Sequence, residues 1–488
     1  GTITDDGIAT VTGTLTATTD AGGSAITLNQ LAVTGAFTLA PNGSGDVTIV
    51  NAAGLNLAAS TMGGDFSGTA TTGDISDSGI LAITGDSTFT AAGGQSVTLN
   101  NTNSFTGTVT FATPSGNLKN VTVTDTTALD LGTLTLAQVS SAGGNLTVNT
   151  GGALTDSGAL VIPGTTTITA TGQVVDLDHT SNNFATILFG SSSNAVSSVE
   201  VVDTNDIIIG PSKSSGNFSV TAGGDVTDSG AVTVGSNLSV VTSAGNGLIN
   251  MGTLEIDGTV VLNTNGNGAA TIVNDAEIDF ATSSVGGALS ATATTGKITQ
   301  SGALTITGTS TLVTSADNGT IDLKVNAITN AFTGKLLITT NDTGSETDGD
   351  VEIDGGTTNL ILGESTIDGD LDLVSGGTIT DDGIATVRGT LTATTDQSNK
   401  IINLDELAVI GAFTLAPHGT GAVTIVNAAG LNLAASTMGG TFSGTATTDD
   451  ISDSGNLAIT GAATFITTAD DRSIILDQSG SVFTSTVT

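Results

Sequence analysis

The sequence predicts an all-β fold, a parallel β-helix (β-solenoid) with about 24 residues per coil and about 20 coils. Three observations predict it: the chain repeats itself, its apolar residues alternate in short runs, and its side chains are small. The 488 residues weigh only 47.4 kDa, 67 are glycine, and 38% are hydrophobic. This apolar content is high enough for a folded chain despite the scarcity of aromatic residues.

A long repeat is visible first. Residues 1–64 align without gaps on residues 377–440, an offset of 376, and 51 of the 64 positions are identical. We therefore expect residues 1–488 to form one continuous solenoid. Residues 1–376 would be one long repeat, and residues 377–488 would begin a second, near-identical copy.

A shorter repeat lies within the long one and is marked by a pentapeptide. It consists of an apolar residue, Thr or Ser, Asp or Gln, a small or acidic residue, and Gly. The number of its glycine rises by 72, 79, 72, 72, 81 and 72 from one pentapeptide to the next. We expect three coils in each of the shorter sub-repeats and turn insertions in the longer ones. The seven pentapeptides are residues 3–7, 75–79, 154–158, 226–230, 298–302, 379–383 and 451–455.

The strands are expected in runs of four to six residues that alternate apolar and polar residues. Residues 121–124 and 303–307 are examples, rich in Val, Ile, Leu and Thr and bounded by Gly, Asn, Asp or Ser. No segment carries an apolar stripe with helical spacing. Sandwiches and tandem immunoglobulin-like domains also use short strands, but they explain a fixed 72-residue spacing poorly and usually need a core Trp or Tyr, which this chain lacks.

Composition excludes several kinds of function. With 46 acidic and 8 basic residues the net charge is −38, so we expect no binding to nucleic acid or to an acidic membrane surface. No run of 18 apolar residues predicts a membrane span, and no membrane insertion is expected in this segment. The sequence contains no Cys, which rules out disulfides and thiolate chemistry.

Candidate metal sites are confined to acidic turns. Asp348, Asp350, Glu352 and Asp354, and then Asp368, Asp370 and Asp372, place several carboxylates near glycines, as calcium requires. A single Gly-Asp fragment at residues 42–46 loses its acid in the second copy, where Ala422 replaces Asp46. Solvated turn carboxylates are the preferred interpretation. No cofactor and no metal-ligand residue is therefore assigned, and calcium at the acidic turns stays an alternative.

Candidate catalytic residues are few. The only histidines are His179 and His418, and His418 stands where the first copy has Asn42, which indicates a turn. Paired carboxylates could support glycoside hydrolysis, but the eight cations are scattered singly and the aromatic residues are all Phe. Equivalent rings such as Phe37 and Phe413 are expected in the core. We predict no enzyme activity and no catalytic residues. Outward Thr-x-Thr runs leave ice binding as a further alternative.

Units such as residues 154–170 and 298–312 resemble the repeat regions of filamentous-haemagglutinin-like exoproteins, which are very large bacterial surface proteins. The resemblance covers essentially the whole chain through composition and repeat pattern. It implies a right-handed β-helix, an extracellular or cell-surface location, and a role as an adhesin shaft or fibre. The family's amino-terminal secretion domain is not in this sequence, so we expect a piece of a longer protein whose export route and anchor stay open.

The function expected is therefore structural: a shaft or fibre segment that gives length and stiffness. Its partners would be further copies of itself, end to end or side by side. The alternative is an adhesive module that contacts glycans or proteins of a host or neighbouring cell through its Thr- and Asn-rich faces.

Overall fold

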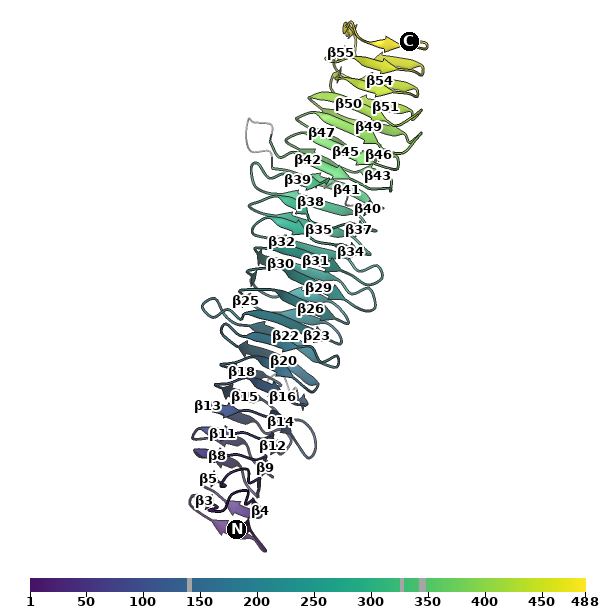
Figure 1. Ribbon diagram of the computed structural model, residues 1–488. Helices are drawn as coiled ribbons and strands as arrows, with labels where there is room; N and C mark the ends of the chain where they lie inside the picture. The colour runs from purple at the N-terminus through teal and green to yellow at the C-terminus, as the bar shows by residue number, and fades with distance from the viewer. Residues whose placement is uncertain (138–142, 325–328, 342–347) are drawn as a thin grey trace. The chain divides into compact units, whose positions relative to one another are not determined.

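The fold is a β-solenoid in which parallel strands stack in about 22 coils. The structure is a computed structural model that describes residues 1–137, 143–324, 329–341 and 348–488. These residues contain strands and turns but no helix, and the pairings between their named strands are parallel. The predicted fold class is confirmed. Figure 1 shows strands of successive coils lying beside one another.

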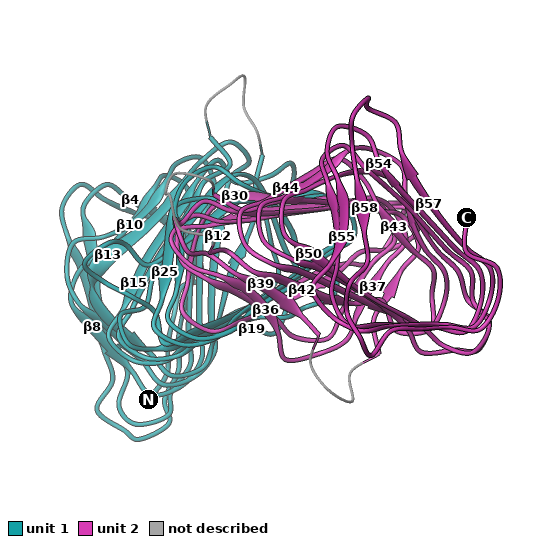
Figure 2. Ribbon diagram, turned by 90° about the horizontal axis from the view of Figure 1, so that it is seen from above, with its two compact units in different colours: residues 1–239 teal, residues 240–488 magenta. Residues whose placement is uncertain are grey.

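The chain divides into two compact units, residues 1–239 and 240–488 (Figure 2). Each is a stack of coils. The expectation that residues 1–488 form one continuous solenoid stays a prediction.

The strands of unit 1 are mostly three to five residues long. They are β1 Ile3–Thr4, β2 Ala9–Val11, β3 Leu15–Thr18, β4 Ile26–Val33, β5 Ala36–Ala40, β6 Val47–Asn51, β7 Leu55–Leu57, β8 Ser60–Met62, β9 Phe66–Ala70, β10 Ile75–Asp77, β11 Leu81–Ile83, β12 Ser87–Ala91, β13 Val97–Phe105, β14 Thr108–Ala112, β15 Val121–Asp125, β16 Leu129–Leu131, β17 Leu134–Thr135, β18 Leu146–Thr150, β19 Leu154–Asp156, β20 Leu160–Thr169, β21 Val174–Leu177, β22 Asn183–Phe189, β23 Ser198–Asp203, β24 Ile207–Ile209, β25 Ser212–Ser214, β26 Phe218–Ala222, β27 Val226–Asp228 and β28 Val232–Val234.

Unit 2 has strands of the same lengths, and its first residues lie in β29 Leu238–Thr242. The others are β30 Ile249–Ile256, β31 Thr259–Asn263, β32 Ala270–Asn274, β33 Ile278–Phe280, β34 Ser283–Val285, β35 Leu289–Ala293, β36 Ile298–Gln300, β37 Leu304–Ile306, β38 Ser310–Thr314, β39 Ile321–Leu323, β40 Ala331–Phe332, β41 Lys335–Thr339, β42 Val351–Asp354, β43 Leu360–Leu362, β44 Ser365–Ile367, β45 Leu371–Ser375, β46 Ile379–Asp381, β47 Ala385–Val387, β48 Leu391–Thr395, β49 Ile402–Val409, β50 Ala412–Pro417, β51 Val423–Asn427, β52 Leu431–Leu433, β53 Ser436–Met438, β54 Phe442–Ala446, β55 Ile451–Asp453, β56 Leu457–Ile459, β57 Ala463–Thr467, β58 Ile474–Ile475 and β59 Val482–Phe483.

Several coils are shorter than the 24 residues expected from the sequence. Val47 of β6 pairs with Phe66, Phe66 with Ser87, and Ser87 with Val109, so the residue number rises by 19, 21 and 22 from one coil to the next. The 72-residue repeat therefore covers about three and a half coils rather than three. Accordingly β6 and β23 lie in one sheet of unit 1, whereas β15, the equivalent strand of the repeat between them, lies in the other. Dividing the period by a whole number of coils caused the error.

The core follows from the alternation within each strand. In β6, β9 and β12 the first, third and fifth residues are buried, and the two residues between them face outward. The rings of Phe66 and Phe89 pack with their centroids 5.2 Å apart, and each side chain is at most 1% exposed. Burying such a side chain stabilises the fold by about 2 to 3 kcal/mol, and each new coil repeats the gain.

Candidate functional site

The pentapeptide of the sequence repeat carries an acid that holds the next coil. The carboxylate of Asp77, at the end of β10, accepts the backbone N–H groups of Asn100 (2.9 Å) and Asn101 (3.1 Å), one coil later. Those N–H groups sit in the bend of β13, where the strand ladder is interrupted. The same pair of hydrogen bonds is made by Asp5 to residues 29 and 30, by Asp381 to residues 405 and 406, and by Asp453 to residues 477 and 478.

A buried asparagine contacts the pentapeptide side chain in three repeats. Nδ2 of Asn103 donates to Asp77 at 2.8 Å, while its Oδ1 accepts the N–H of Leu81 at 2.8 Å. Asn182 serves Asp156 in the same way. In the fifth pentapeptide Gln300 replaces the acid, and Oε1 accepts from Asn330 at 2.9 Å. Because the uncharged amide of Gln300 accepts the same hydrogen bond, the position requires a hydrogen-bond acceptor rather than a charge. This supports a structural role for the position.

A second buried position, which we call the corner position, was missed by the sequence analysis. At the end of β6, Asn51 is fully buried, and its Oδ1 accepts the N–H of Val33 at 2.8 Å. Its Nδ2 donates to the carbonyl oxygens of Val33 (2.9 Å) and Gly54 (2.7 Å). The side chain thus replaces a strand neighbour where the ladder breaks. Asn274 and Asn427 repeat these contacts. The available signal was an Asn at an inward strand position.

The candidate calcium ligands are engaged with other partners. Asp350 accepts the N–H of Asp370 (2.8 Å), and Asp370 accepts the N–H of Thr390 (2.6 Å). Asp354 accepts the N–H of Gly356, Asp368 pairs with Arg388, and Asp372 pairs with Lys324. In the part of the chain that the structure describes, no group of three or more His, Cys, Asp or Glu residues could hold a metal ion.

Three acids lie in one row on the outside of unit 2. Asp322 pairs in register with Glu352, and Glu352 with Asp372, so like charges are neighbours across parallel strands. Such neighbours repel. Lys324 contacts Asp372 and lies 3.8 Å from Glu352. Burial lowers the pKa of Lys324, but the hydrogen bond and charges of these acids outweigh burial and raise the pKa above its ordinary value. The lysine therefore stays charged and offsets the repulsion.

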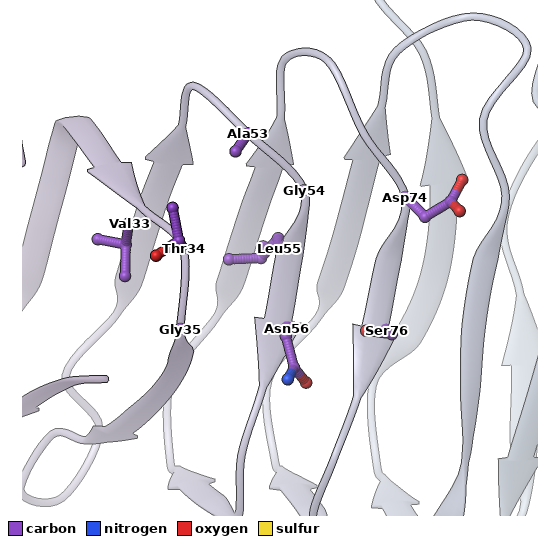
Figure 3. Close-up of a pocket in the computed structure, with 9 residues that line it drawn as sticks. All are labelled: Val33, Thr34, Gly35, Ala53, Gly54, Leu55, Asn56, Asp74 and Ser76. Atoms are coloured by element: carbon purple, nitrogen blue, oxygen red, sulfur yellow. The ribbon is translucent and has the colours of Figure 1, made fainter. Parts of the chain in front are cut away.

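A surface hollow occurs at equivalent places in both long copies. In unit 1 a hollow of about 350 Å³ is lined by Thr34, Asn56, Asp74 and Ser76 among others (Figure 3). A hollow of the same size in unit 2 is lined mostly by the residues 376 positions later, among them Asn432, Asp450 and Ser452, with Ile410 in place of Thr34. Oδ1 of Asn56 and Oδ1 of its copy Asn432 are buried and accept no hydrogen bond.

The remaining candidates are not among the residues that line these two hollows. His418 lies in a turn, as expected. Its Nδ1 is 2.7 Å from the carbonyl oxygen of Asp396, which lies 22 residues earlier in the chain. His179 lies in a turn in which Ser181 donates to its Nδ1. Phe37 and Phe413 are fully buried, so the prediction that such rings belong to the core is confirmed. Among the described residues no helix is long and apolar enough to cross a membrane.

Fold and contacts together define a β-solenoid repeat protein whose coils are joined by backbone ladders and buried polar side chains. A family model described as repeats of unknown function (DUF5649) matches most of the chain, and the protein belongs to this family. The matched segments are residues 44–112, 118–189, 196–269, 267–339, 348–414 and 420–488. No curated protein and no solved structure matches the chain.

The family repeat and the corner position coincide. Asn51 lies seven residues after the first match begins, and the same holds for four further corner residues in four other matches. These are Asp125, Asp203, Asn274 and Asn427. The interval between the starts of successive matches is close to the interval between successive pentapeptides. The repeat unit is thus marked by a recurring hydrogen-bonding position.

Proposed function

We propose that this chain is a structural shaft or fibre segment of a large secreted or cell-surface bacterial protein of the filamentous-haemagglutinin-like kind. The observation that carries the proposal is the uniformity of the coils. Inward apolar residues, a pentapeptide side chain that accepts hydrogen bonds and a buried Asn or Asp at the corner position recur from repeat to repeat. Each further coil of the same kind adds to the length and the stiffness of the solenoid.

The extracellular location rests on the resemblance and on composition. A chain without Cys forms no disulfide before export, and 38 excess negative charges keep neighbouring chains apart in solution. We propose further copies of the same chain as partners, end to end or side by side. No catalysis, cofactor, nucleic acid or membrane insertion forms part of this function.

Deletion of one complete repeat tests the shaft. Removing residues 384–455, the segment that runs from one pentapeptide to the end of the next, takes out about three and a half coils. At about 4.8 Å per coil the particle should shorten by roughly 17 Å and keep its width, and cells should bind the full-length chain no better than the shortened one. Class averages from electron microscopy measure the length, and binding of the chain to cells measures the adhesion. Loss of adhesion with this single repeat would contradict the shaft and place recognition within it.

A second candidate, an adhesive module for glycans, is favoured by the paired hollows. Each is lined by an amide, a carboxylate and a hydroxyl, and such groups suit sugar hydroxyls. The double substitution Asn56→Ala and Asn432→Ala should then abolish binding on a glycan array. Thr311→Ala, at an outward position of β38, is the matched control. Unchanged glycan binding in the double variant would rule out these hollows.

A further inference from the structure

The corner position is occupied by an asparagine in some repeats and by an aspartate in others. In three repeats it holds an asparagine, at residues 51, 274 and 427, and in two repeats of unit 1 it holds an acid, Asp125 and Asp203. The geometry is equivalent, because the acid also accepts the N–H of the residue two positions past the ladder break: Phe105 for Asp125 and Phe184 for Asp203. Asp125 is 2% exposed and Asp203 3%.

An ionised acid cannot replace the asparagine fully. Nδ2 of Asn51 donates to two carbonyl oxygens, whereas a carboxylate has no proton to donate and repels the same oxygens. At Asp125 the conflict is visible, because its Oδ2 is buried and has no partner. The hydroxyl of Thr127 lies 3.2 Å from the Phe105 carbonyl oxygen and 3.0 Å from Asp125, and its single proton can serve only one of them.

At Asp203 both oxygens accept backbone N–H groups, one from Phe184 and one from Asn205 at 2.8 Å. The residue that corresponds to Thr127, two positions on, is Asn205, and its backbone N–H is already used. The carbonyl oxygen of Phe184 corresponds to that of Val33, to which the asparagine corner donates.

The neighbouring strands, all within the described residues, supply no positive charge to hold the acids ionised. The strands that pair with β15 beside Asp125 are β13 and β18, and they contain no charged residue. Beside Asp203, β22 and β26 contain none either, and β21, which pairs with β23, contains only the acid Asp176. The charged group that acts on Asp203 is Asp206, a like charge in the following turn. Glu200, on β23 with Asp203, points outward and is exposed.

We propose that Asp125 and Asp203 are proton-binding sites of unit 1: each takes up a proton from mildly acidic solvent, and the neutral carboxylic acid then donates to the Phe105 or Phe184 carbonyl oxygen as an asparagine does. No covalent bond between heavy atoms is made or broken. The two coils are thereby stabilised in acid and loosened at neutral pH, while the asparagine corners are indifferent to pH.

The direction of the pKa shifts of the two acids agrees with this proposal. Burial raises the pKa of Asp203 to about 6 and also raises the pKa of Asp125, despite the hydrogen bonds that oppose it. A raised folded-state pKa means that the folded chain binds the proton more tightly than the unfolded chain. The stabilisation is therefore complete below the unfolded pKa of about 4 and is lost as the pH rises through about 6.

Hydrogen exchange of the full chain, read at single amides and corrected for the intrinsic exchange rate, tests the proposal. Protection of the Phe184 amide should fall about tenfold for each pH unit between about 4 and 6, relative to the Val33 amide beside Asn51. In Asp203→Asn the ratio should become independent of pH, and protection at neutral pH should rise. Asp125→Asn should do the same at Phe105.

The reciprocal variant Asn51→Asp supplies the matched control. In this variant the protection of the Val33 amide should depend on pH. It should be close to the wild-type protection only in acid. A flat profile at Phe184 in the wild-type chain, or a loss of protection in Asp203→Asn at every pH, would overturn the proposal. Should Asn51→Asp unfold at neutral pH, the two aspartate-to-asparagine variants still decide the question.

Discussion

At the scale of single residues, buried polar side chains act as replacements for missing backbone. Where a strand bends and its ladder breaks, a buried N–H or C=O would lose its partner, which costs about 1 to 3 kcal/mol for each group. Asn51 satisfies both groups of Val33 with one amide, and Ser60 supplies the acceptor for the N–H of Leu39 at 2.9 Å. The solenoid can therefore bend without leaving these buried backbone groups unpaired.

Removing one such side chain should open its corner. In Asn51→Ala the N–H and C=O of Val33 lose their partners, so local stability should fall by about 2 to 4 kcal/mol. Hydrogen exchange at Val33 measures the loss. Asn100→Ala removes an exposed side chain and should change stability by less than about 0.5 kcal/mol. Equal effects in the two variants would argue against the corner role.

At the scale of the element, the pentapeptide glycine lets one coil pass close over another. A Cβ built on Gly302 would lie 2.1 Å from the backbone N of Thr282, and one on Gly79 would lie 2.3 Å from the backbone N of Ala59. Neither glycine has a positive φ. At these two positions glycine is thus required by the close approach of two coils and not by a left-handed backbone.

Gly302→Ala should consequently force the two coils apart and cost about 3 kcal/mol or more of stability, because backbone rather than a flexible side chain is in the way. Gly252→Ala is the matched control in the same unit, since a Cβ there meets nothing within 4 Å. Thermal unfolding of both variants provides the measurement. A Gly302→Ala chain as stable as the control would show that the coils can spread freely.

The sequence predicted the strands, the repeat and the inward Phe residues because alternation and composition report burial directly. It predicted neither the half-coil offset of the repeat nor the hollows. The half-coil offset depends on how tightly the bends at Asn51 and Asn103 turn, and the hollows depend on which coil lies next to Asn56. The sequence could not show that Asp372 and Asp368 form ion pairs, because their partners Lys324 and Arg388 lie far away in the sequence.

At the scale of the whole molecule, the net charge of −38 should govern association between copies. Repulsion between chains is screened within about 10 Å at 0.1 M salt, so light scattering should show association that grows with ionic strength. Calcium and sodium salts compared at equal ionic strength separate screening from specific binding. Screening alone predicts the same association in both. Stronger association in calcium, reversed by a chelator, would reveal a calcium site after all.

The most direct test of the shaft is electron microscopy of the native material, first with calcium and then with chelator. Fibres of uniform width with an axial spacing near ~4.8 Å are the predicted result, because every coil adds one strand spacing to the stack. Short isolated particles, or globules joined like beads on a string, would contradict the shaft and return attention to separate binding domains.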